Sequence, residues 1–258
     1  MASLIRFITS IAALTLCLAA GAQAQAQVTV IVASESWDQL LYLGDKNEPK
    51  GPLADFVRRM DEVQDKFHFE LKLFPRLRLD QVFIDKAADV YPLRTTEWTR
   101  PELGLLPTKT IVNSGDLYFA KRGNRFGGGK VFANLASKNI VGVRGYHYRL
   151  FNNNADEAHI KKNFNAYLVA SNEAVLKFIL ADRADVGIVP EVIMAQYLKD
   201  PAMRAQLIVG GYDSRVELSN LVRQDGPISV AEMDAIIDLL ARAGDVDKLK
   251  KYFRAIKR

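Results

Sequence analysis

The segment from Val28 to Ala33 is a nearly unbroken β-branched run, typical of a strand that is buried on both faces of a sheet. Apolar residues at helical spacing follow from Leu53 to Val63, and an alternating strand pattern follows from His68 to Phe74. A short helix over Gln81–Ala88 and a strand at Asp89–Tyr91 complete a β-α-β-α-β unit. This order predicts a parallel sheet with helices on both faces.

A second α/β unit is predicted after a short strand at Leu117–Ala120 and a loop, rich in glycine and basic residues, at Lys121–Lys130. Its predicted strands are Asn139–Val143, Ala166–Val169 and Asp185–Val189, with helices beginning after Ser171 and Pro190. The pattern changes again near Gly210, and Ser229 and Glu232 then form a capping box at the start of the first of two closing amphipathic helices. Two α/β units predict two lobes with a cleft between them.

The first 26 residues resemble a cleaved signal peptide. Arg6 precedes an apolar run from Phe7 to Ala20, and small-x-small cleavage sites follow at residues 22–26. A membrane anchor is the alternative, but the run is short for a span of ~20 residues. The only cysteine, Cys17, lies in the run behind Leu16, a context that does not favour lipidation. We therefore expect an exported protein of the bacterial periplasm, without cysteine chemistry in the mature chain.

Charge and histidine spacing argue against two other classes. Removal of the leader leaves 34 basic against 30 acidic residues, which are interspersed rather than gathered in the basic stripe typical of nucleic-acid binding. The histidines His68, His147 and His159 have no metal-ligand spacing, and no cofactor motif is present. We expect no nucleic acid, metal or cofactor, and a monomer.

The segment from Tyr91 to Pro107 has the composition of an anion site. It places Arg94, Arg100, three threonines and Trp98 close together, just after the third predicted strand. A guanidinium beside hydroxyl groups suits a carboxylate, because the planar fork binds both oxygens. A polar surface turn is the alternative interpretation.

Ligands of open parallel sheets bind at the carboxyl ends of the strands, so the residues that follow the predicted strands form a candidate site. From the first unit it takes the residues after each strand, and from the second unit it takes the segments at 144–148, 171–172 and 190–191. The candidate ligand-binding residues are Arg100, Thr95, Trp37, Arg94, Arg76, Arg144, Tyr146, His147 and Glu191.

The order of several weak motifs resembles the type II periplasmic solute-binding proteins of ABC importers, in the amino-acid-binding branch (extracellular solute-binding protein family 3). The similar segments include Gly51–Phe56, Lys86–Asp89, Thr95–Arg100, Val141–Gly145, Ala184–Val189 and Leu239–Phe253. The resemblance implies a two-lobed α/β fold, each lobe a mostly parallel sheet flanked by helices. It implies one lobe from residues 27–117 plus 213–258 and another from residues 118–212, hinged near 117–121 and 210–217.

The same resemblance implies roles for single residues. Arg100 falls on the arginine that grips the ligand carboxylate, Thr95 on a nearby hydroxyl, Tyr146 or His147 on the second-lobe contact, and Trp37 on an aromatic side wall. Two positions depart from the pattern: Glu97 replaces a hydroxyl, and Pro190 replaces the aspartate that pairs with the ligand ammonium, with Glu191 beside it. Because the first of these lobes is also rich in arginine at its strand ends, we expect a carboxylate-bearing solute rather than a plain amino acid.

The resemblance implies capture of a small anionic or zwitterionic solute by cleft closure, with an inner-membrane ABC permease as partner and no catalysis. Two alternatives stay open. One is an enzyme on the same fold, similar to cyclohexadienyl dehydratases, for which Glu35, Glu97, Glu191 and His147 are the only candidate acids or bases. The other is a sensor or adaptor that binds a protein partner, for instance through the loop at Lys121–Lys130.

Overall fold

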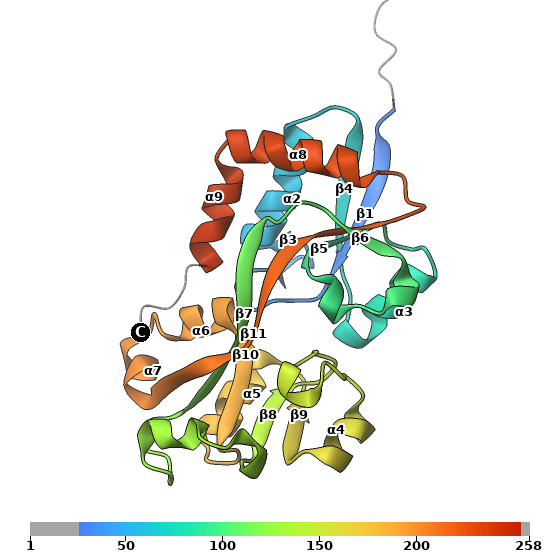
Figure 1. Ribbon diagram of the computed structural model, residues 1–258. Coiled ribbons are helices and arrows are strands. Elements are labelled where there is room, and N and C mark those ends of the chain that lie inside the picture. Colours follow the sequence, from blue (N-terminus) through green and yellow to red (C-terminus); the bar gives the residue numbers. More distant parts are fainter. Residues whose placement is uncertain (1–25, 254–258) are drawn as a thin grey trace, which may run out of the picture.

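The computed structural model describes residues 26–253. The expected signal peptide therefore lies outside the described residues, apart from Ala26, and so does the end of the last predicted helix. The described chain forms two α/β lobes, drawn one above the other in Figure 1, with strands β7 (Val112–Lys121) and β11 (Leu207–Arg223) running through both. The predicted α/β fold, in which each lobe has a mostly parallel sheet flanked by helices, is confirmed, and β7 and β11 add antiparallel pairs to it.

The first lobe is built on a sheet in which β1 lies between β4 and β5, and all three are parallel. Its elements before the first crossing are β1 (Val28–Ser34), β2 (Tyr42–Leu43), β3 (Pro49–Lys50), α2 (Pro52–Glu62), β4 (Phe67–Leu73), α3 (Leu79–Ile84), β5 (Val90–Arg94) and β6 (Leu105–Pro107). Short 3₁₀ turns lie at Arg76–Arg78, Thr96–Trp98 and Pro101–Leu103. Val30 and Val32 are fully buried, as the β-branched run predicts, and so is Val90 on the neighbouring β5.

The second lobe repeats the pattern, with β8 between β9 and β10 in a parallel arrangement. Its elements are β8 (Ile140–Val143), α4 (Glu157–Asn163), β9 (Ala166–Val169), α5 (Asn172–Leu180), β10 (Val186–Pro190), α6 (Glu191–Tyr197) and α7 (Pro201–Gln206). Short 3₁₀ turns lie at Gly128–Phe132, Leu135–Ser137 and Arg149–Phe151. The side chain of Ser171 accepts a hydrogen bond from Ala174 N, so the predicted N-cap of α5 is present.

Two long strands join the lobes. β7 (Val112–Lys121) and β11 (Leu207–Arg223) are antiparallel to each other, and they complete a sheet of order β4-β1-β5-β11-β7-β10-β8-β9, with β6 paired to β11. The sequence predicted only a short strand at 117–120 and no strand after Gly210. The register of β11 on β7 shifts twice between Val209 and Ser214, and these irregularities interrupt the alternation on which a strand prediction depends.

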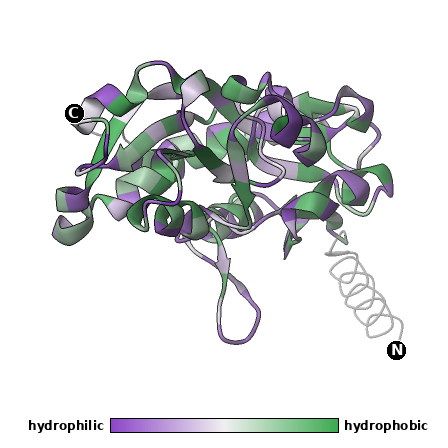
Figure 2. Cartoon of the chain, turned by 90° about the horizontal axis from the view of Figure 1, so that it is seen from below, coloured by the Kyte–Doolittle hydropathy of each residue, from purple (hydrophilic) through white to green (hydrophobic). Residues whose placement is uncertain are grey.

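The chain ends on the first lobe. Helices α8 (Val230–Arg242) and α9 (Asp245–Lys250), followed by a 3₁₀ turn at Lys251–Phe253, pack against α2. The capping box of Ser229 and Glu232 is present. Figure 2 shows mainly hydrophobic strands inside and many hydrophilic loops around them. Among residues 26–253, no helix combines the length and apolar character needed to span a membrane.

Candidate functional site

The strand ends of both lobes face each other across the cleft. Glu35 follows β1, Arg76 follows β4, and Arg94 is the last residue of β5. From the second lobe, Arg144 follows β8 and Asn172 begins α5 after β9. Because parallel strands place their carboxyl ends at one edge of the sheet, these residues meet where a ligand of this kind of fold would lie.

Arg94 is buried in an ion pair. Its Nη1 lies 3.0 Å from Glu35 Oε1, and Tyr91 donates a hydrogen bond of 2.6 Å to the other oxygen of Glu35. The two charged side chains are 4% and 5% exposed. Burial opposes the ionisation of Glu35, but the guanidinium groups of Arg94 and Arg76 and the Tyr91 hydroxyl outweigh it and hold the pKa of Glu35 below its usual value.

The same guanidinium is held on its faces by aromatic rings. Its carbon lies 4.8 Å from the ring centroid of Tyr91 and 5.2 Å from that of Trp98, within the range of cation–π attraction. Thr95, also buried, uses its side chain to accept a hydrogen bond from Glu97 N and begin the next 3₁₀ turn. The segment that the sequence singled out therefore places Arg94 inward, against the lobe's own side chains.

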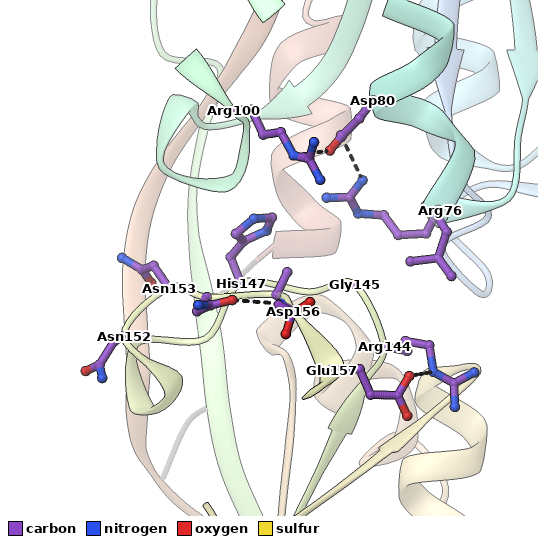
Figure 3. Close-up of a pocket in the computed structure, with 13 residues that line it drawn as sticks. Arg76, Asp80, Arg100, Arg144, Gly145, His147, Asn152, Asn153, Asp156 and Glu157 are labelled. Carbon is purple, nitrogen blue, oxygen red and sulfur yellow. Dashed lines mark hydrogen bonds and ion pairs between the residues drawn. The ribbon is translucent and has the colours of Figure 1, made fainter. Parts of the chain in front are cut away.

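Arg100 lies apart from Arg94, at the rim of the cleft. Its side chain is 67% exposed, and its Nε lies 3.2 Å from Asp80 Oδ2. Figure 3 shows Arg100, Asp80 and Arg76 on the first-lobe side, facing His147 and Arg144 on the second-lobe side. These residues line a groove of about 650 Å³, here called the polar groove, which also includes the segment 152–157.

Arg76 and His147 are the least satisfied polar groups of this groove. The Arg76 side chain is 11% exposed, and among residues 26–253 its one ion-pair contact is Asp80, at 3.5 Å. Within the described part of the chain, the buried Arg76 Nε and His147 Nδ1 have no hydrogen-bond partner. Burial and the positive charges of Arg76 and Arg94 lower the pKa of His147 to about 4, so its imidazole is neutral at neutral pH.

A second groove, of about 600 Å³, lies on the other side of Arg76, Leu77 and Arg144, which line both grooves. It is here called the apolar groove, because its wall includes Leu43, Leu73, Phe74 and Leu77 of the first lobe. Polar residues lie among them: Asn172 of the second lobe donates a hydrogen bond of 3.1 Å to Asp38 of the first. The two lobes are thus in contact across the cleft.

A small inner cavity of about 20 Å³ lies between the grooves and the crossing strands, lined by Trp37, Arg94, Trp98, Ser114, Asp116, Tyr146, His147, Pro190 and Leu218. Its volume suits about one water molecule. Asp116, on β7, is buried and accepts a hydrogen bond of 3.2 Å from Ser214. Burial, and after it the nearby Asp213 carboxylate, raises the pKa of Asp116 to about 7.

The remaining predicted residues occupy different parts of this region. Trp37 and Tyr146 line the inner cavity. Arg144 lies in the grooves, where its Nε is 2.6 Å from Glu157 Oε2. Glu191, beside Pro190 at the start of α6, is buried and accepts a hydrogen bond of 2.7 Å from Tyr212. Within residues 26–253, no group of three or more histidine, cysteine, aspartate or glutamate residues is arranged to hold a metal ion.

Sequence reasoning missed several cleft residues, among them Asp116 and Asp38. Asp116 precedes Leu117, at which the predicted strand begins, so the prediction leaves it outside the strand. The residues before it, Val112 to Gly115, belong to the same strand, and a longer strand would have placed Asp116 in the sheet. Asp38 lies in a turn with a φ of 46°, and nothing in the sequence around it indicates a contact with the second lobe.

Comparison with solved structures identifies the fold as that of the type II periplasmic binding proteins. An ancestral amino-acid-binding protein, a precursor of cyclohexadienyl dehydratase, matches with 14% identity over 88% of this chain and 95% of its own, at a TM-score of 0.65. A putative ABC-transporter binding component from Wolinella succinogenes, complexed with lysine, matches with 11% identity over 89% and 96% of the two chains, at a TM-score of 0.68.

A histidine kinase sensor domain with similarity to periplasmic binding proteins also matches, with 14% identity over 92% of this chain and 100% of its own, at a TM-score of 0.69. No family model matches the sequence, and neither does any curated protein. At these identities the similarity shows the fold alone. That fold is shared by binding proteins, a dehydratase precursor and a sensor domain.

Proposed function

We propose that the protein is a periplasmic solute-binding protein that captures a small carboxylate-bearing solute by closure of its two lobes. Transport by an ABC importer, export by a cleaved signal peptide and a monomeric state are parts of the same proposal. The similarity to ABC-transporter binding components supports it, as does the resemblance of the first 26 residues to a leader.

The proposed ligand class rests on the environment of Arg76. A largely buried guanidinium whose ion-pair contact among the described residues is Asp80, at 3.5 Å, is costly, and a carboxylate in either groove would give it a second anionic partner. Burial disfavours its charged form, but Tyr91, Glu35 and Asp80 raise the pKa of Arg76 above its ordinary value, so it remains a cation. Arg94 does not compete for the ligand, because Glu35 already holds it.

Arg100 has the second role in the proposal. Its exposed guanidinium pairs with Asp80, and an exposed pair of this kind contributes little, so it is free to turn toward a ligand as the lobes close. We therefore assign the main carboxylate contact to Arg76 and a rim contact to Arg100. His147, neutral and facing the same groove, supplies a hydrogen bond without adding charge.

The test is a thermal-shift screen of the mature protein against amino acids, dicarboxylates, aromatic acids and polyols, followed by calorimetric titration of the best carboxylate. We expect Arg76→Gln to lower the affinity for that carboxylate by roughly 30-fold or more, since it removes a largely buried charged contact. Arg100→Gln should lower the affinity by about three- to tenfold. The control is Arg58→Gln on the surface of α2, which should leave the affinity unchanged.

Two results would contradict the proposal. If polyols stabilise the protein and carboxylates do not, the anion site is wrong. If mass spectrometry of the incubated mixtures shows conversion of the bound acid, the protein is an enzyme rather than a carrier. Unchanged affinity in Arg76→Gln would leave the ligand class intact but remove Arg76 as its main contact.

A further inference from the structure

The two grooves beside Arg76 differ in the chemistry of their walls. The polar groove is lined by charged and amide side chains, including Asp80, Asn152 and Asp156. The apolar groove has aliphatic and aromatic side chains on the outer part of its first-lobe wall, with Glu35, Asp38 and Arg76 at its inner end. A ligand whose carboxylate lies at Arg76 has room for the rest of its body in one groove or the other, so the wall chemistry decides which body is favoured.

The apolar wall keeps hydrophobic side chains open to solvent. Leu77 is 66% exposed and Leu43 is 50% exposed, and both line the apolar groove beside the partly buried Leu73 and Phe74. A single exposed leucine needs no explanation, but two on one concave surface with further apolar neighbours are typical of a ligand or partner site. The groove is concave and about 600 Å³ in volume, in the range of small-molecule sites.

The charges at the inner end of this groove are largely engaged by protein groups. Glu35 is paired with Arg94, and Arg144 with Glu157. Asp38 accepts a hydrogen bond from Asn172, and burial raises its pKa, which disfavours its negative charge. Arg76 is left with its Nε unpaired among the described residues. The inner end therefore offers one cationic contact, and the wall that leads outward from it offers apolar surface.

We infer that the ligand is a monocarboxylate with an apolar body, whose carboxylate lies at Arg76 and whose body lies on the wall formed by Leu43, Leu73, Phe74 and Leu77. This inference rests on the proposed function and names its substrate class. It excludes short dicarboxylates, because their second carboxylate would be desolvated against the apolar wall. It also excludes plain amino acids, whose ammonium group would lie beside the Arg76 guanidinium.

The test compares straight-chain acids of increasing length with dicarboxylates of the same length. We expect octanoate and hexanoate to bind more tightly than acetate, by about fourfold for each methylene buried. Adipate should bind more weakly than hexanoate, since it has a carboxylate where hexanoate has its distal methyl group. Norleucine, which is hexanoate with an α-ammonium group, is the amino-acid comparison, and it should bind more weakly than hexanoate as well.

A variant pair locates the body of the ligand. Leu43→Ser should lower the affinity for hexanoate by about three- to tenfold and leave that for acetate unchanged, because Leu43 lines the apolar groove alone and only the longer acid reaches it. Leu106→Ser is the matched control, since Leu106 is 42% exposed on β6 and lies outside both grooves. Both leucines are exposed, so neither substitution should unfold the protein.

The outcomes separate this inference from the proposed function. Adipate or norleucine binding as tightly as hexanoate, or hexanoate affinity unchanged in Leu43→Ser, overturns the apolar-body inference while carboxylate capture stands. If no carboxylate of the series binds, both proposals are wrong. Chain-length dependence that is reduced in Leu43→Ser and kept in Leu106→Ser supports both.

Discussion

Replacing Glu35 by glutamine removes the negative charge of the buried Glu35–Arg94 pair and keeps a side chain of nearly the same size. The guanidinium then stays in a site where its side chain is 4% exposed, without a counter-ion at 3.0 Å. Removing one partner of a buried pair costs about 3–5 kcal/mol, because the other charge remains desolvated. For a chain of this length, that loss corresponds to a decrease in melting temperature of roughly 6–20 °C.

The assay is thermal and urea denaturation of the single variants Glu35→Gln and Arg94→Met and of the double variant. We expect the double variant to be more stable than the sum of the single losses predicts, because it removes both charges together. The exposed pair of Asp55 and Arg58 is the control, and Arg58→Met should cost less than about 1 kcal/mol. If Glu35→Gln costs no more than Arg58→Met, or if the single losses add, the reasoning about burial is refuted.

Two further predictions concern stability. Between about pH 4 and 7 the native protein keeps a proton on Asp116 that the unfolded chain has released, so this group makes stability fall as the pH rises through that window. Asp116→Asn should remove that contribution, and a difference in melting temperature from wild type that is constant with pH would contradict it. Ser229→Ala removes the side-chain acceptor for Glu232 N at the start of α8, and it should cost about 1 kcal/mol in urea denaturation; a loss below a few tenths would show that water replaces the cap.

Much of the fold followed from local patterns. The strands β1, β4, β8, β9 and β10 and the helix α2 lie within one or two residues of their predicted bounds, because each has a strong apolar period and a clear cap or breaker. The crossing strands were not predicted at full length. Their residues alternate poorly, since β7 and β11 pass from one lobe to the other and β11 carries register shifts.

The sequence predicted where the site lies better than it predicted which side chains contact each other there. Strand ends and arginine content indicated the cleft, but the pairing of Arg94 with Glu35 depends on side chains that lie 59 residues apart. A sequence shows which groups are able to bind an anion and not which of them the protein itself has already neutralised. Arg94 is already neutralised by Glu35, whereas Arg76 lies beside both open grooves.

The return of the chain to the first lobe has a consequence for biosynthesis. The parallel strands β8, β9 and β10 of the second lobe lie within one stretch, from β8 to α7, and the crossing strands β7 and β11 extend their sheet. The first lobe needs its last partners, α8 and α9, which cover α2 and arise only at the end of the chain. The parallel strands of the second lobe are therefore made before the first lobe receives its covering helices, and premature termination near Gly226 would uncover the part of α2 that packs against α8 and α9.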